Sequence, residues 1–179
     1  MGGIAFQFVR TNRTIWYCMN GDAGSRMARF GREDWLALGR AILATEGSSS
    51  LTIEALTARA GKTRGSFYHH FRDRAAFVAA LAEAWAREVA ETPPEATDLA
   101  LERAMRALPE AGDAIHAADN ARRAAFRASL PVPEDGAEPY VELALMVFLG
   151  AVSQPETSEA RLAALLRLYE EMAAAHWNE

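Results

Sequence analysis

The chain has 179 residues, of which 50% are hydrophobic and 24% charged, and its formal net charge at pH 7 is −5. This length allows one or two small domains with a packed core. The longest apolar run, residues 141–152, contains Glu142 and is too short to cross a bilayer of about 30 Å. The single cysteine, Cys18, excludes an internal disulfide, and no secretory signal pattern is present. We therefore expect a cytoplasmic protein with no membrane partner.

Residues 1–26 show no sustained hydrophobic period, so we predict a tail, either disordered or an extension upstream of the native start. A second interpretation is a basic arm that reaches DNA through Arg10, Arg13 and Arg26. The sequence does not decide whether this segment belongs to the native protein.

The first helix is predicted over residues 31–46. Trp35, Leu38 and Ile42 recur there at helical spacing, and Gly47 follows as a stop signal. The serine run at residues 48–50 then predicts a polar loop into the next helix.

Residues 51–71 predict two short helices joined by one sharp turn. Thr52 can cap the first helix, and Gly61 supplies the left-handed residue that ends it. Thr63 can cap the second helix, which Phe67 and Phe71 can anchor against the first. This pattern indicates a helix-turn-helix, whose second helix can lie in the DNA major groove, although an ordinary helical hairpin has the same spacing. The side chains left for other faces are Lys62, Arg64, Ser66, Tyr68, His69 and His70.

The run AGKTRGSFYHHFRDRAAFVAAL, residues 60–81, resembles the signature of the TetR family of transcriptional regulators. One departure is Lys62, because the family usually has an apolar residue there that packs under the turn; a lysine stem can cover the same surface. The resemblance implies a DNA-binding unit followed by a helical domain that binds an effector and dimerises. The matching positions are Ala60, Gly61, Thr63, Arg64, Gly65, Ser66, Phe67, Tyr68, Phe71 and Arg74.

The remaining chain is also predicted to be helical. Asp73 is placed to cap a long helix that Pro93 and Pro94 end, and further helices are expected at residues 99–108, 113–129, 139–152 and 158–177. The predicted fold class is therefore all-α. We divide the chain into the tail (1–26), a three-helix helix-turn-helix DNA-binding domain (27–73) and a helical effector-binding and dimerisation domain (74–179).

Charge divides near the same boundary. Residues 27–74 hold eight Lys or Arg against five Asp or Glu, a net charge of +3, whereas residues 75–179 have a net charge of −10. The overall acidity therefore does not argue against DNA binding, because the positive potential is local to the helix-turn-helix.

Nine side chains are predicted to contact an operator in double-stranded DNA. Arg64, Ser66 and His69 are assigned to base edges, since an arginine suits a guanine edge. Hydroxyl groups and basic side chains suit backbone oxygens, and Arg74 lies at a helix N-terminus that itself favours an anion. The residues assigned to phosphate are Thr52, Lys62, Thr63, Tyr68, His70 and Arg74.

A small-molecule effector site is predicted between the long connecting helix and its neighbours. Core packing explains the same residues equally well, and the family resemblance favours the pocket without naming a ligand. Because the candidate lining has few charges, we expect a compact, largely apolar effector. The candidate ligand-binding residues are Trp85, Met105, Ile115, His116, Phe126 and Met146.

Nothing in the sequence predicts an enzyme. Asp113, His116 and Asp119 recur every three residues on one helical face, which suggests either a polar ligand site or ordinary solvated surface. No nucleophile accompanies them, so we expect no catalytic residues, no metal and no cofactor.

The last two helices are predicted to form a homodimer interface. Residues 141–152 are apolar on nearly every side, and Gly150, Ala151, Ala163 and Ala164 would permit close approach. The alternative is that this surface packs entirely within one subunit. The predicted stripe on the last helix consists of Leu162, Leu165, Leu166, Tyr169 and Met172.

Together these features predict a DNA-binding transcriptional regulator, specifically a ligand-responsive repressor that binds a near-palindromic operator as a homodimer. Two alternatives belong to other classes: a helical ligand-binding protein that has lost operator recognition, and a small enzyme that uses the Asp113 and His116 face. The sequence defines neither the operator, nor the effector, nor the sign of regulation.

Overall fold

The structure is a computed structural model that describes residues 30–130 and 136–177, and these residues form helices and connecting segments with no strand. The predicted all-α class is confirmed, and the helix ends fall within two residues of the predicted bounds except at α3, which ends at Tyr68 and so excludes Phe71, contrary to the prediction. The predicted tail, residues 1–26, lies outside the described residues. The α-helices are α1 (Arg32–Glu46), α2 (Ile53–Ala60), α3 (Arg64–Tyr68), α4 (Arg74–Glu91), α5 (Leu99–Arg106), α6 (Gly112–Ser129), α7 (Glu138–Ser153) and α8 (Glu159–Trp177), joined in part by the short 3-10 helices η1 (Ser48–Ser50), η2 (Pro94–Ala96) and η3 (Pro109–Ala111).

Side-chain caps define the starts of α2, α3 and α4. The side chains of Thr52, Thr63 and Asp73 each accept a hydrogen bond from the backbone N–H three residues later, at 3.1, 3.2 and 2.7 Å. Gly61 ends α2 with a φ of 59°, in the left-handed region that favours glycine. The chain therefore makes the sharp turn that the sequence pattern predicts.

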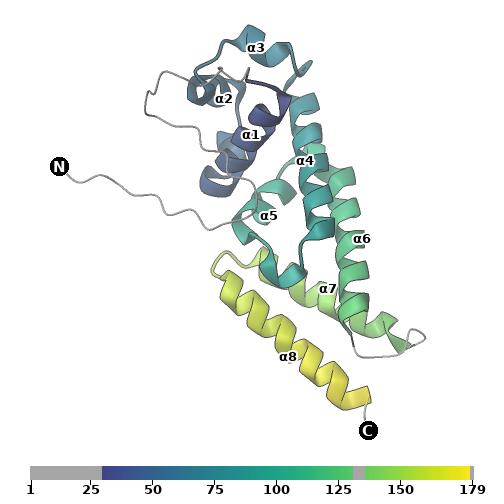
Figure 1. The fold of residues 1–179 in the computed structure, drawn as a ribbon. Helices are drawn as coiled ribbons and strands as arrows, with labels where there is room; N and C mark the ends of the chain where they lie inside the picture. The colour runs from purple at the N-terminus through teal and green to yellow at the C-terminus, as the bar shows by residue number, and fades with distance from the viewer. Residues whose placement is uncertain (1–29, 131–135, 178–179) are drawn as a thin grey trace, which may run out of the picture.

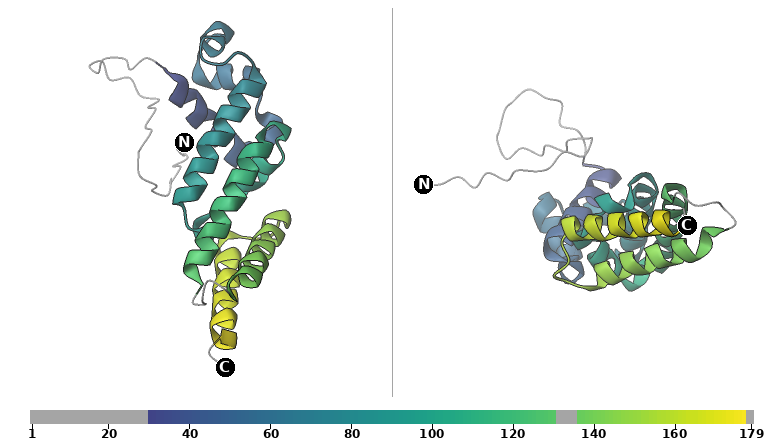
Figure 2. Two further views of the ribbon diagram at one scale, coloured as in Figure 1. Left: turned by 90° about the vertical axis from the view of Figure 1, so that its right-hand side faces the viewer. Right: turned by 90° about the horizontal axis from the view of Figure 1, so that it is seen from below.

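The helices form an elongated molecule with α1, α2 and α3 at one end and α7 and α8 at the other (Figure 1). α4 and α6 run side by side along its length, as the second view also shows (Figure 2). α5 packs against α1, and α7 packs against both α6 and α8. No helix in the described part of the chain is long and apolar enough to cross a membrane.

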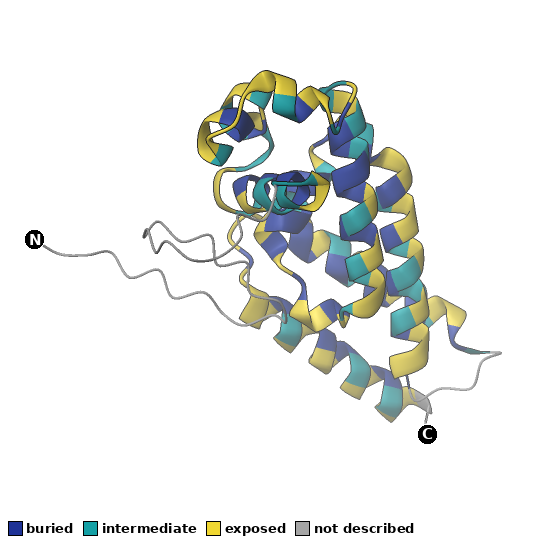
Figure 3. Ribbon diagram, turned by 45° about the horizontal axis from the view of Figure 1, so that its top comes forward, coloured by how far each residue is buried: buried dark blue, intermediate teal, exposed yellow. Residues whose placement is uncertain are grey.

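Hydrophobic packing is continuous across residue 73. One core cluster extends from Trp35 in α1 through Phe67 and Phe77 to Met105 in α5. A second cluster joins α6, α7 and α8 around Phe148. Figure 3 shows the buried faces of α1 and α4 turned toward each other. The division into two domains at residues 73 and 74 stays a prediction, because the core does not separate there.

Gly39 marks the closest approach between α1 and α4. A Cβ atom added at Gly39 would lie 2.5 Å from Cζ of Phe77 and 3.1 Å from Cδ2 of Leu81. Gly39→Ala should therefore lower the free energy of unfolding by about 1–3 kcal/mol through overpacking, measured by urea denaturation. Gly112→Ala is the matched control, because a Cβ at Gly112 meets nothing within 4 Å. Equal stability of the two variants would show that α1 and α4 do not pack this closely.

A buried charge network joins α5 to α6. Glu102 is fully buried, and its carboxylate accepts hydrogen bonds from Arg106 at 2.7 Å and from Arg122. Both arginines also pair with Asp119. The Arg122 guanidinium, on a residue only 2% exposed, lies 4.4 Å from the ring centroid of Phe148. Because two acidic and two basic groups meet here, the network is balanced in charge.

Arg103 fixes the corner between α7 and α8. Its guanidinium donates hydrogen bonds to the carbonyl oxygens of Val152, Gln154 and Thr157, at 2.8, 2.8 and 3.0 Å. These groups include the unpaired carbonyls at the C-terminal end of α7, which would otherwise lack partners. α5 thus determines where α8 begins.

Candidate functional site

The helix-turn-helix has a buried anchor and an exposed outer surface. Phe67 in α3 is fully buried, and its ring lies 5.4 Å from that of Trp35 and 5.5 Å from that of Phe77. Across the turn, the backbone N–H of Lys62 donates to the carbonyl of Thr57 at 3.0 Å. α3 is therefore held by its apolar side against α1 and α4, which leaves its other side in solvent.

The nine predicted DNA-contacting residues differ in exposure. Ser66, His70 and Arg74 are half-buried, whereas the remaining six are exposed: Thr52, Lys62, Thr63, Arg64, Tyr68 and His69. Tyr68 is 50% exposed although it is a large aromatic residue. They lie at the N-cap of α2, in the turn, on α3, in the loop after it and at the start of α4, and these segments lie at the end of the molecule farthest from α8 (Figure 1). Their assignment to DNA stays a prediction.

Arg64 occupies the start of α3 and has only a weak intramolecular partner. Its guanidinium pairs with Glu54 of α2, and both side chains are more than half exposed. An exposed pair of this kind contributes about 1 kcal/mol or less, and salt screens it further. Arg64 is therefore available to an external partner at small energetic cost.

The Lys62 side chain covers apolar surface beside the turn, as expected for a lysine in place of the family's apolar residue. Its ammonium lies 5.7 Å from the ring centroid of Phe30, whose ring in turn lies edge-on to Trp35 at 4.9 Å. The lysine therefore covers an aromatic group beside the turn while it stays exposed. The one departure from the family signature is accommodated without loss of the turn.

Arg74 has two intramolecular partners. Its Nε donates to the carbonyl of Leu51 at 2.9 Å, and its Nη1 donates to Glu110 of η3 at 2.7 Å. Its assignment to phosphate stays a prediction, and these contacts tie the start of α4 to the segment between η1 and α2 and to η3. Arg72, which sequence reasoning left out, is 86% exposed on the same loop, and hydrogen bonding to Asp73 raises the pKa of its guanidinium. Its position in the sequence, between Phe71 and the helix-capping Asp73, could have indicated an exposed basic side chain on this loop.

The predicted effector residues differ in burial, and two of them, Trp85 and Phe126, line two different cavities of the described chain. Trp85, Met105 and Phe126 are buried, Ile115 is half-buried, and His116 and Met146 are exposed. Met146 is exposed on α7 and Met105 is fully enclosed by the core, and the assignment of both to an effector stays a prediction. The cavity that Trp85 lines combines apolar side chains with the charged residues Arg40, Glu88, Asp98, Glu102 and Glu159.

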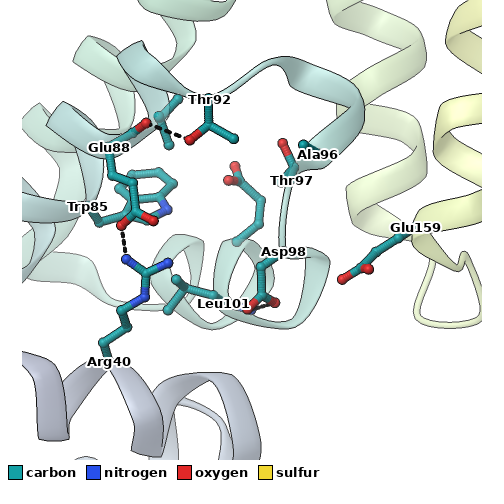
Figure 4. A pocket seen from close by; sticks show the side chains of 11 residues that line it. Arg40, Trp85, Glu88, Thr92, Ala96, Thr97, Asp98, Leu101 and Glu159 are labelled. Carbon is teal, nitrogen blue, oxygen red and sulfur yellow. Dashed lines mark hydrogen bonds and ion pairs between the residues drawn. The ribbon is translucent and has the colours of Figure 1, made fainter. Parts of the chain in front are cut away.

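That cavity has a volume of about 440 Å³ and lies where α1, α4, α5 and α8 approach one another (Figure 4). Its lining comes from residues far apart in the sequence, which explains why local patterns missed it. A second cavity, of about 420 Å³, opens beside η2 and the ends of α4 and α6, and Phe126 lines it. The residues that line the first cavity are Arg40, Trp85, Glu88, Val89, Thr92, Ala96, Thr97, Asp98, Leu101, Glu102 and Glu159.

Of Asp113, His116 and Asp119 on α6, two are exposed to solvent, and only the carboxylate of Asp119 forms ion pairs. Asp113 and His116 are exposed, and Asp119 belongs to the network with Arg106 and Arg122. Within residues 30–130 and 136–177, no three His, Cys, Asp or Glu side chains are grouped so that they would hold a metal ion.

α7 and α8 expose apolar side chains on their outer faces. On α7 these are Leu143 and Met146, three residues apart; on α8 they are Leu165, Leu168 and Met172, at spacings of three and four. The rest of the predicted stripe on α8 packs inward instead: Leu162, Leu166 and Tyr169 are buried against α7. Of the small residues, Gly150 is exposed, whereas Ala151 is buried within the subunit.

Comparison with known proteins agrees with this geometry. Residues 36–81, from α1 into α4, match the family model of bacterial regulatory proteins, tetR family. No curated protein matches the chain. Among solved structures, the reduced form of NemR from E. coli has a TM-score of 0.56 and 20% identity, over 80% of this chain and 95% of that chain. This likeness shows a shared fold. Residues 36–81 are therefore similar to the DNA-binding domain of tetR-family regulators, which supports a DNA-binding transcriptional regulator.

Proposed function

We propose that this protein is a ligand-responsive repressor that binds a near-palindromic operator in double-stranded DNA as a homodimer. The observation that carries the proposal is the way α3 is presented. Phe67 is fully buried, whereas Arg64 and Tyr68 on the same short helix are exposed. A recognition helix needs this division, because it must be fixed to its own domain while its polar side enters a groove.

The charge distribution supports DNA as the partner. The segment 27–74 carries a net charge of +3 within a chain of net charge −5. A local positive surface attracts phosphate, and the acidic remainder favours approach by the helix-turn-helix end. Repression rather than activation is what the family resemblance implies.

Exposed apolar faces on α7 and α8 support a homodimer. Among the described residues, five of the six large hydrophobic side chains that are exposed lie on these two helices. Their spacing of three and four residues suits a second pair of helices packed nearly parallel to the first. A two-fold dimer of this kind would present two copies of α3 to successive turns of DNA, which requires a near-palindromic operator.

Arg64→Ala should weaken specific binding by about 1–3 kcal/mol and relax the preferred base at one position in each half-site. The reason is that a guanidinium at the start of α3 can form two hydrogen bonds to a guanine edge. Arg127→Ala is a suitable control, because Arg127 is also exposed and paired, with Glu138, but lies on α6. Competition binding against single-base operator variants measures both effects. An unchanged base preference for Arg64→Ala would remove Arg64 from the base-reading set.

The proposed function is tested by a gel-shift experiment with the DNA upstream of the protein's own gene. We expect salt-sensitive, sequence-specific retardation that competing nonspecific DNA does not abolish. A helical ligand-binding protein that has lost operator recognition would show no specific complex. Lys62 is the feature that favours this alternative, but its packing over Phe30 leaves the turn intact.

A further inference from the structure

The cavity between α1, α4, α5 and α8 has more negative than positive charge. Four carboxylates line it against the single guanidinium of Arg40. Glu88 is paired with Arg40, and Glu102 is paired with Arg106 and Arg122. Asp98 and Glu159 form no ion pair with any residue in the described ranges. Glu159 extends from the start of α8 toward Asp98 (Figure 4), so two unbalanced negative charges face this space.

The opposite wall of the cavity is apolar and aromatic. Trp85 presents its indole from α4, next to Val89, and Leu101 adjoins them from α5. The faces of an indole ring attract cations as well as apolar groups. Burial lowers the pKa of Arg40, and the charge of Asp98, which lines the same cavity, opposes that shift.

Thr97 provides a polar group that has no use within the described fold. The residue is only 9% exposed, and it lines the cavity between η2 and α5 (Figure 4). Its hydroxyl forms no hydrogen bond with any residue of the described chain. The hydroxyl is therefore open to a ligand in the cavity and could accept a hydrogen bond from it.

We propose that this cavity binds a compact aromatic cation that carries N–H donors. The cationic group would lie between the carboxylates of Asp98 and Glu159, with an N–H donated to the hydroxyl of Thr97. The ring would contact Trp85 and its apolar neighbours. The assignment gives the chemical class of the effector, and its regulatory part rests on the proposed function of a ligand-responsive DNA-binding protein.

The same cavity contains a direct link to the DNA-binding helices. Arg40 of α1 pairs with Glu88 of α4 at the cavity wall (Figure 4). A cation bound beside Asp98 repels the guanidinium of Arg40 and offsets the attraction of Asp98 for it, which weakens the tie between α1 and α4. Because coupling between sites is reciprocal, operator binding and cation binding should each lower the affinity for the other.

Three probes of one shape and different charge test the site in the full chain. Isothermal titration calorimetry compares 2-naphthamidinium, 2-naphthamide and 2-naphthoate, which carry charges of plus one, zero and minus one. We expect the order of affinity to follow that order of charge. Equal affinities, a preference for naphthoate, or no saturable binding of naphthamidinium would each overturn the proposal.

Matched variants locate the binding. Asp98→Asn/Glu159→Gln should weaken naphthamidinium by about fivefold to tenfold and leave naphthamide little changed. The change at Asp98 should preserve the fold, because the Asp98 side chain caps α5 at 3.0 Å and asparagine caps helices as well as aspartate does. Glu83→Gln/Glu156→Gln makes the same change of net charge outside the cavity and should retain wild-type affinity. Equal losses in the two double variants would place the site elsewhere and overturn the proposal.

Thr97→Val tests the hydrogen bond from the ligand to Thr97 without changing the charge of the cavity. It should weaken naphthamidinium by about twofold to tenfold but leave 2-naphthyltrimethylammonium, which has no N–H, unaffected. Equal effects on both cations would contradict the role of the hydroxyl.

A separate measurement on DNA keeps this proposal distinct from the proposed function. Naphthamidinium should weaken operator binding by the wild-type protein, and it should do so less in Asp98→Asn/Glu159→Gln. Specific operator binding that naphthamidinium leaves unchanged would overturn the regulatory link while the DNA-binding function stands. A protein that binds no operator, but binds the probes in the expected order, would contradict the proposed function and support the site.

Discussion

Leu165→Glu should convert a dimer into monomers and abolish operator binding at the protein concentrations where the unaltered chain binds fully. Leu165 lies on the outward face of α8 with Leu168 and Met172. In a two-fold interface the substitution introduces two carboxylates at once, and each loses its water without gaining a partner. We expect the dimer dissociation constant to rise on the order of a thousandfold. Sedimentation equilibrium measures the association, and a gel shift measures DNA binding.

Ala117→Glu is the control for this experiment, because Ala117 is exposed on α6, away from the outward face of α7 and α8. It should leave both association and operator binding unchanged. A Leu165→Glu protein that sediments as a dimer and still binds its operator would show that α8 does not form the interface.

Glu102→Ala should lower the free energy of unfolding by about 3–5 kcal/mol. The substitution removes the carboxylate that pairs with Arg106 and Arg122, and Arg122 is 2% exposed with Nε already lacking a hydrogen-bond partner in the described chain. Burial lowers the pKa of Arg122, and the charge of Glu102 opposes this effect. Without Glu102, a buried guanidinium would remain largely uncompensated. Chemical denaturation followed by circular dichroism gives the change.

Two variants distinguish loss of the buried pair from loss of any ion pair. Glu142→Ala removes the partner of Arg123 on the surface, at 3.0 Å, and should change stability much less. Glu102→Leu/Arg122→Met replaces both buried charges with apolar groups and should recover most of the stability that Glu102→Ala loses. If the double variant were less stable than Glu102→Ala, desolvation of Arg122 would not be the main cause.

Local sequence signals predicted the helices and the helix-turn-helix well. Thr52, Thr63 and Asp73 cap helices where the pattern placed them, and Gly61 adopts the left-handed conformation. These features depend on neighbours within a few residues, so a single sequence contains them. The burial of Phe67 and Phe71 was also predicted, but the helical face assumed for both was wrong, because α3 ends at Tyr68 and Phe71 packs against Phe67 from the following loop.

The effector cavity was not predictable in the same way. Its charged lining comes from Arg40, Glu88 and Glu159, which lie more than 40 residues apart in sequence and meet only when α1, α4 and α8 are packed. Apolar residues such as Met105 look the same in sequence whether they line a cavity or fill a core. The outward face of α8 was ambiguous for the same reason. Leu165 and Leu166 are identical neighbours in sequence, but tertiary packing leaves Leu165 exposed and buries Leu166.

The most direct test of the account is selection of bound sequences from a random pool of double-stranded DNA by the full-length protein. The account predicts enrichment of one near-palindromic sequence whose half-sites are centred about 10 base pairs apart or a multiple of that distance. Quantitative binding to the selected sequence should have a stoichiometry of whole dimers. Failure to enrich any sequence, or enrichment of a single half-site bound by one subunit, would contradict it.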